Sequence, residues 1–121
     1  MKILIVDDEK EFSEFLAFRL GQLGYEVFQA ENGSKGLEVT KSEKPNVILA
    51  DVQMPEMDGY EFTRIVKSTK DINSIPIIML TSLENSESIS KALTSGAEDY
   101  IGKPCDLSKL VEKLRKVGHH E

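Results

Sequence analysis

The chain has 121 residues, of which 40% are hydrophobic and 30% are charged, and this length suits one ordinary globular domain with one core. Its net charge of −6 disfavours direct contact with nucleic acid or with an anionic membrane surface. No apolar run approaches the roughly 20 residues that span a bilayer, and Cys105 has no second cysteine to pair with, so we expect a cytoplasmic protein without an internal disulfide.

Strands and helices are predicted to alternate along the whole chain. In chain order, apolar runs predict strands at 3–6, 25–30, 47–50, 75–80 and 100–101. Apolar residues at helical spacing predict helices around 12–23, 37–40, 62–66, 89–93 and 107–117. The first helix is expected to bury one stripe, formed by Phe12, Phe15, Leu16, Leu20 and Leu23.

This alternation predicts an α/β fold with right-handed crossovers and a single doubly wound sheet. The expected architecture has five parallel strands in the flavodoxin-like order 2-1-3-4-5 with five helices. The first and third strands then lie side by side, and their connections leave toward opposite faces. Ligands in such sheets bind in the crevice beyond the carboxyl ends of these strands. The residues directly after Val6 and Ala50 are therefore the candidate site residues.

Three carboxylates, Asp7, Asp8 and Asp51, are expected to meet in this crevice. Because they repel one another, a cation should neutralise them, and hard oxygen ligands favour Mg2+, with Mn2+ as an alternative, over zinc. The same rule brings Thr81 and Lys103 to this edge from the last two strands. Three acids, a hydroxyl and a lysine suit phosphoryl transfer, in which a carboxylate can itself be the acceptor.

Several ordered motifs resemble the receiver domains of bacterial two-component response regulators, and in particular chemotaxis-regulator-like receivers. They are VDDE at 6–9, LADVQMPEMDG at 49–59, LTS at 80–82 and GAEDYIGKP at 96–104. The resemblance covers nearly the whole chain. It implies that Asp51 is the phosphoacceptor, that Asp8 and Asp51 bind the metal directly, and that Asp7 binds it through water. It also implies that Gln53 supplies a main-chain carbonyl to the metal.

The same resemblance assigns the remaining motif residues. It implies that Thr81 and Lys103 contact the phosphoryl oxygens, that Tyr100 is the family's switch aromatic, and that Lys103–Pro104 is a cis peptide. It further implies a signalling domain, not an enzyme, that assists its own phosphorylation and dephosphorylation. The implied partners are a sensor histidine kinase or phosphotransfer protein and an output partner or domain at the fourth helix, last strand and fifth helix. A homodimer of the phosphorylated form is left open.

Taken singly, these residues fit ordinary structural roles. Asp8 with Glu11, and Thr81 with Glu84, have the form of a helix cap with a capping-box partner. Lys103 alone would be a solvated surface lysine. Their joint occurrence in order favours the functional interpretation.

Three other functions compete with this one. A haloacid-dehalogenase-like phosphatase needs a second aspartate where Gln53 stands, and a flavodoxin needs a phosphate loop where Asp7, Asp8 and Glu9 would repel the phosphate. A phosphorylation-independent pseudo-receiver binding module is the remaining alternative.

The receiver domain is expected to cover 1–118, with 119–121 as a short tail or an expression remnant. Because the first strand starts directly behind Met1, the chain should begin a gene product. It is either a stand-alone regulator or the first part of one with an output domain.

Overall fold

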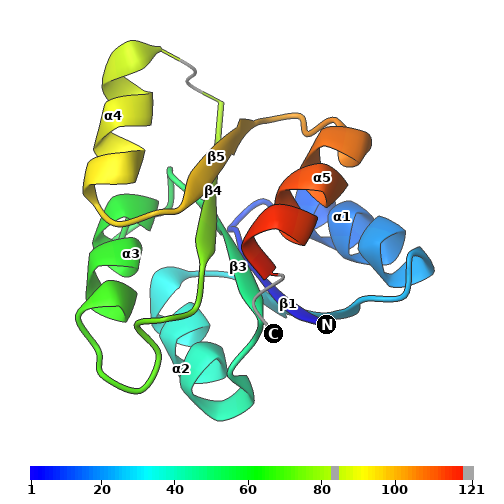
Figure 1. The fold of residues 1–121 in the computed structure, drawn as a ribbon, viewed down its shortest axis with the longest axis horizontal. Coiled ribbons are helices and arrows are strands. Elements are labelled where there is room, and N and C mark those ends of the chain that lie inside the picture. The colour runs from blue at the N-terminus through cyan, green and yellow to red at the C-terminus, as the bar shows by residue number, and fades with distance from the viewer. Residues whose placement is uncertain (83–84, 119–121) are drawn as a thin grey trace.

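The structure, a computed structural model, describes residues 1–82 and 85–118. Its core is one five-stranded parallel sheet in the order β2-β1-β3-β4-β5, which confirms the predicted doubly wound fold (Figure 1). The strands are β1 (Lys2–Val6), β2 (Glu26–Ala30), β3 (Val47–Asp51), β4 (Ile77–Thr81) and β5 (Asp99–Gly102). The helices are α1 (Lys10–Gln22), α2 (Gly33–Glu43), α3 (Gly59–Lys67), α4 (Ser86–Thr94) and α5 (Leu107–Gly118).

The helices cover both faces of the sheet, α1 and α5 on one face and α2, α3 and α4 on the other (Figure 1). Successive strand residues point to opposite faces of the sheet. Ile3, Ile5 and Leu49 pack with Leu16 of α1 and Leu110 of α5. Strand residues that alternate with these, such as Leu4 and Ile48, pack in a second cluster with residues of α3 and α4. Because both faces are covered, β1, β3 and β4 are almost completely buried, as their continuous apolar runs predict.

Two details of the prediction are wrong. The fourth strand begins at Ile77 and not at Ile75, because Ile75 N–H closes a turn on the carbonyl of Ile72 and Pro76 has no N–H to donate. The apolar stripe of α1 is narrower than expected: Phe15 is 60% and Leu23 is 54% exposed.

The three helices that cover the second face begin at side-chain caps. Asn32, Asp58 and Asn85 each accept a hydrogen bond from the backbone N–H three residues further on, at 2.8–2.9 Å. Asp58 thus places the start of α3 directly after the loop that follows β3. Within the described ranges, no helix has both the length and the apolar character needed to cross a bilayer.

Candidate functional site

Strand register brings the predicted site residues to one edge of the sheet. Val6 pairs with Ala50, so Asp7 and Asp51, which follow them, lie opposite each other at the ends of β1 and β3. Thr81 pairs with Gly102, so Lys103 leaves the end of β5 beside the end of β4. The sequence-predicted residues therefore do converge, and their expected roles stay predictions.

The three carboxylates form the cluster that the sequence predicts. Asp7, Asp8 and Asp51 each offer a carboxylate oxygen, and these oxygens lie within 4.8 Å of one another. Asp7 and Asp51 are buried, whereas Asp8 is exposed at the rim. A cavity of about 410 Å3 opens beside them, with Asp8 and Gln53 in its wall. Oxygen ligands around an open, hydrated space match the coordination preferences of Mg2+.

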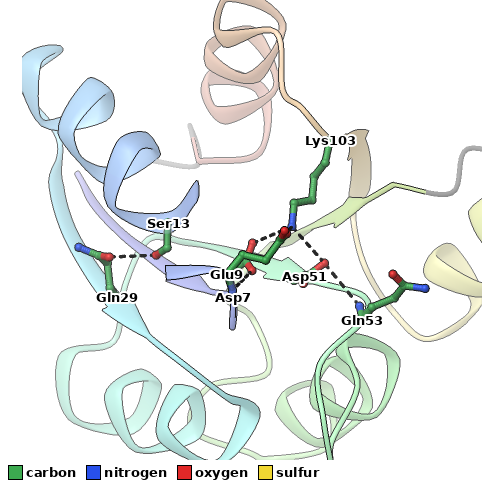
Figure 2. Close-up of polar contacts among 7 residues, drawn as sticks. All are labelled: Asp7, Glu9, Ser13, Gln29, Asp51, Gln53 and Lys103. Carbon is green, nitrogen blue, oxygen red and sulfur yellow. Dashed lines mark hydrogen bonds and ion pairs between the residues drawn. The ribbon is translucent and has the colours of Figure 1, made fainter. Parts of the chain in front are cut away.

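Both oxygens of Asp7 have partners within the protein. Oδ1 accepts a hydrogen bond of 2.9 Å from the backbone N–H of Glu9, and Oδ2 accepts one of 3.1 Å from Nζ of Lys103 (Figure 2). The Asp7 side chain is fully buried. These bonds leave Asp7 less able than Asp8 to turn an oxygen toward a metal.

Lys103 is the cation of the site. Its side chain is 10% exposed, and its Nζ also donates to Oε1 of Glu9 and lies 3.7 Å from Oδ1 of Asp51. The ammonium lies 4.5 Å from the centre of the Phe12 ring, which is a cation–π distance. Burial lowers the pKa of Lys103, but the bonds to Glu9 and Asp7 and the charge of Asp51 outweigh burial and raise it overall. Lys103 is therefore a fixed positive charge at neutral pH.

Asp51 is a buried acid with an altered protonation equilibrium. Burial and the charge of Asp7 raise its pKa to about 7, while Lys103 and the backbone N–H of Gln53 act in the opposite direction. The Gln53 N–H lies 3.4 Å from Oδ1 of Asp51, so this hydrogen bond is long (Figure 2). A divalent cation would supply the positive charge that the site lacks.

Gly59 lets α3 approach the backbone of Asp51. Its N–H donates to the carbonyl of Val52 at 2.9 Å. A Cβ at position 59 would collide with the carbonyl oxygen of Asp51 and would lie 2.6 Å from Cε of Met79. Asp58 therefore caps α3, and Gly59 allows the start of that helix to pack directly against the end of β3.

Thr81 ends β4, whereas Tyr100 lies within β5 opposite Met79, two residues before the position that pairs with Thr81. Thr81 is buried, while Tyr100 is partly buried against the core, with Nζ of Lys113 lying 5.6 Å from the centre of its ring. The backbone N–H of Lys103 donates to the carbonyl of Thr81 at 2.8 Å, which ties the two segments together. The Lys103–Pro104 bond is cis, as the resemblance implies.

The ordinary structural interpretation of Asp8 is wrong, because the N-cap residue of α1 is Glu9. The equivalent interpretation of Thr81 is also wrong, because Thr81 ends β4 and the N-cap residue of α4 is Asn85. Its expected partner Glu84 lies outside the described residues, as do residues 119–121. Cys105 packs, partly buried, against one of the core clusters. Burial raises the pKa of its thiol to about 11, so it stays protonated.

Sequence reasoning missed two contacts of Lys103, those with Glu9 and Phe12. The available signal was weak. Because Glu9 directly follows two other acids, its position suggests another member of the carboxylate cluster. The position of Phe12 suggests a residue of the apolar stripe of the first helix.

This fold and this edge define a doubly wound α/β protein with a polar site at the carboxyl ends of its strands. A family model for the response regulator receiver domain matches residues 3–115. The chain therefore belongs to the receiver domains of two-component systems, in which receivers pair with histidine kinases.

Solved structures agree with this assignment. A response regulator from Chloroflexus aurantiacus superposes with a TM-score of 0.93 and 30% identity, covering 98% of both chains. The chemotaxis protein CheY4 of Vibrio cholerae superposes with a TM-score of 0.90 and 32% identity, covering 96% of this chain and 97% of that one. The receiver domain of sensor histidine kinase PA1611 from Pseudomonas aeruginosa, with magnesium coordinated in its active-site cleft, has a TM-score of 0.90 and 27% identity, covering 98% of both.

A curated relative, the probable transcriptional regulator ycf27 of Porphyridium aerugineum, is 38% identical over 116 residues, which are 96% of this chain and 47% of that protein. The chain thus spans about half the length of such relatives.

Proposed function

We propose that this receiver domain accepts a phosphoryl group on Asp51 from a histidine kinase or phosphotransfer protein, in a reaction that needs Mg2+. The observation that carries the proposal is the surroundings of Asp51: a buried carboxylate, two further acids within 4.8 Å and a lysine ammonium at 3.7 Å. This is the inventory that phosphoryl transfer requires, because the protein mainly positions the group and neutralises its charge.

In the proposed reaction an oxygen of the Asp51 carboxylate forms a bond to phosphorus as the bond to the donor breaks. With a phosphohistidine donor, the leaving imidazole takes up a proton from water. With acetyl phosphate, the leaving group is acetate. Lys103 lies close enough to neutralise charge on the phosphoryl oxygens after a small movement, and Thr81 supplies a hydroxyl at the neighbouring strand end.

The residues present fit Mg2+, which would supply charge neutralisation at the phosphoryl oxygens. We assign Asp8 and Asp51 as direct ligands, Asp7 as a ligand through water, and Gln53 as the source of a main-chain carbonyl. The magnesium ion in the receiver of PA1611 supports this choice. Mn2+ has similar ligand preferences and is the alternative.

The role that we propose is that of a cytoplasmic signalling domain, not an enzyme, that assists its own phosphorylation and dephosphorylation. The proposed output face comprises α4, β5 and α5, with Tyr100 as the switch residue, and it serves a partner protein or an output domain. We propose that the phosphorylated form can also dimerise through this face.

The test is Mg2+-dependent labelling with acetyl phosphate, compared between wild type and Asp51→Asn. We expect one phosphoryl group per wild-type chain and none in the variant, since an amide of nearly the same shape is a poor nucleophile. The folded state of the variant is checked by circular dichroism. Equal labelling of the variant would place the acceptor elsewhere, and absence of labelling in both would favour the phosphorylation-independent binding module.

A further inference from the structure

Glu9 occupies the N-cap position of α1, but its side chain does not cap the helix. The residue is extended, with φ −85° and ψ 94°, and makes no side-chain cap hydrogen bond. N-cap positions favour Ser, Thr, Asp and Asn, whose short side chains reach the free N–H groups of the first turn. The Glu9 carboxylate instead accepts a hydrogen bond from Nζ of Lys103 (Figure 2). The Glu9 side chain therefore interacts with the site lysine and does not cap α1.

The partners of Lys103 differ in how firmly they are held. Asp7 is fully buried and is also bonded to the backbone, so it is a fixed anchor. Glu9 is 62% exposed and reaches Lys103 from the rim. The Phe12 ring lies on the same helix as Glu9 and contacts the same ammonium. Together these groups hold Nζ on the α1 side, 3.7 Å from Asp51 and beyond hydrogen-bond distance.

We propose, as an extension of the proposed phosphoacceptor function, that Glu9 is a positioning residue that restrains Lys103 and competes with the phosphoryl group for its ammonium. A phosphoryl group on Asp51 offers strong acceptor oxygens. To contact them, Lys103 moves toward Asp51 and gives up the bond to Glu9, while the buried Asp7 stays in place. The strength of the Glu9–Lys103 bond thereby opposes formation of the phosphoryl–lysine contact.

Glu9→Gln removes the charge without removing a helix cap, so the variant should fold normally. The matched control is Glu11→Gln, which removes the same charge from an exposed residue in the first turn of the same helix. Both variants lose one acidic charge at the start of α1. Only Glu9→Gln loses the ion pair with Lys103.

The first measurement is the NMR signal of the Lys103 ε-methylene group in the protein free of metal and phosphate mimic. The Phe12 ring lies against the ammonium, so its ring current reports the position of this group. We expect the signal to move in Glu9→Gln and to stay in place in Glu11→Gln. An unchanged Lys103 signal in Glu9→Gln would overturn the proposed restraint.

The second measurement is the affinity for the phosphate mimic beryllofluoride in saturating Mg2+. We expect Glu9→Gln to bind it roughly three- to tenfold more tightly than Glu11→Gln, as the loss of a partly buried ion pair implies. Equal affinities in the two variants, or weaker binding by Glu9→Gln, would overturn the competition. Failure of wild type to bind the mimic would count against the phosphoacceptor function itself, and the Lys103 signal would still decide whether Glu9 restrains the lysine.

Discussion

The ammonium of Lys103 lies 3.7 Å from Oδ1 of Asp51, within ion-pair distance and outside hydrogen-bond distance. The lysine therefore stabilises the ionised Asp51 carboxylate through charge alone. It does not outweigh burial and the charge of Asp7, which leave the pKa of Asp51 at about 7. This incomplete compensation explains why a metal ion, the solution pH and a phosphoryl group should each act strongly on the site.

Magnesium should stabilise the folded protein, because it binds acids that come together only in the native state. At ten times Kd the expected gain is about 1.4 kcal/mol in the free energy of unfolding. Asp8→Asn should reduce the gain, since Asp8 is the exposed member of the cluster. Thermal unfolding with and without Mg2+ measures this, with Asp71→Asn, in the loop before β4, as the control. Equal gains in Asp8→Asn and wild type would exclude Asp8 as a ligand.

The pH dependence of stability should reveal Asp51. Its folded-state pKa of about 7 lies above the ordinary value of 3.8, so the folded protein binds more protons than the unfolded chain between these values. The contribution of Asp51 to stability therefore falls as pH rises through this window, and the penalty is complete above pH 7.

Asp51→Asn removes this titration and should stabilise the metal-free protein at pH 7.5 by on the order of 1–2 kcal/mol, with little effect near pH 4. Urea unfolding of both proteins across the window provides the comparison. The affinity for Mg2+ should also fall below pH 7, because protons and metal compete for Asp51. A stability difference between the two proteins that does not change with pH would contradict the raised pKa.

Gly59→Ala should destabilise the protein, because the new methyl group has no space between the Asp51 carbonyl and Met79. Overpacking costs about 1–3 kcal/mol, which exceeds the gain of up to about 1 kcal/mol that alanine brings to a helix. Gly21→Ala is the matched control, since a Cβ there meets nothing within 4 Å, and it should stabilise α1. Denaturant unfolding of the two variants should give opposite signs. Stabilisation by both substitutions would show that the end of β3 can shift to accommodate the added methyl group.

Thr81→Ala should weaken the response to phosphorylation without preventing it. A hydrogen bond from Thr81 to the phosphoryl group is worth about 1–3 kcal/mol, and the movement would open space for Tyr100 to rotate inward. Converting a 1:99 population to 99:1 needs about 5.5 kcal/mol, so Lys103 and the metal must contribute as well.

NMR spectra with beryllofluoride and Mg2+ test this coupling, and Thr81→Ser serves as the control that keeps the hydroxyl. We expect smaller shifts around Tyr100 and α4 in Thr81→Ala than in wild type or Thr81→Ser. If all three proteins bind the mimic and show the same shifts, the hydroxyl does not transmit the signal.

The fold and the place of the site follow from local patterns in the sequence. Apolar runs such as 47–50 lie between helical patterns, and parallel strands that alternate with helices have few arrangements. Once the order 2-1-3-4-5 is expected, Asp7 and Asp51 must follow neighbouring strand ends. This explains why residues 44 positions apart could be placed together before any coordinates were known.

Side-chain partners were less predictable. Whether Lys103 bonds to Asp51, Asp7 or Glu9 depends on differences of about an ångström in reach, which residue spacing does not contain. The apolar stripe predicted for α1 was wider than the observed one for a related reason. Helical periodicity predicts a broad buried face, but α1 buries only a narrow one. Ser13 is buried and donates a hydrogen bond to Gln29, while Phe15 is exposed.

The site is assembled from segments that span most of the chain, since Asp7 comes early and Lys103 close to the end. During synthesis Asp51 emerges from the ribosome well before Lys103, because the chain is made from its N-terminus. A nascent chain that stops short of Lys103 carries the acceptor without the cation that completes its surroundings. Under the proposed function, the complete set of acids, hydroxyl and lysine around Asp51 exists only once the last strand has joined the sheet.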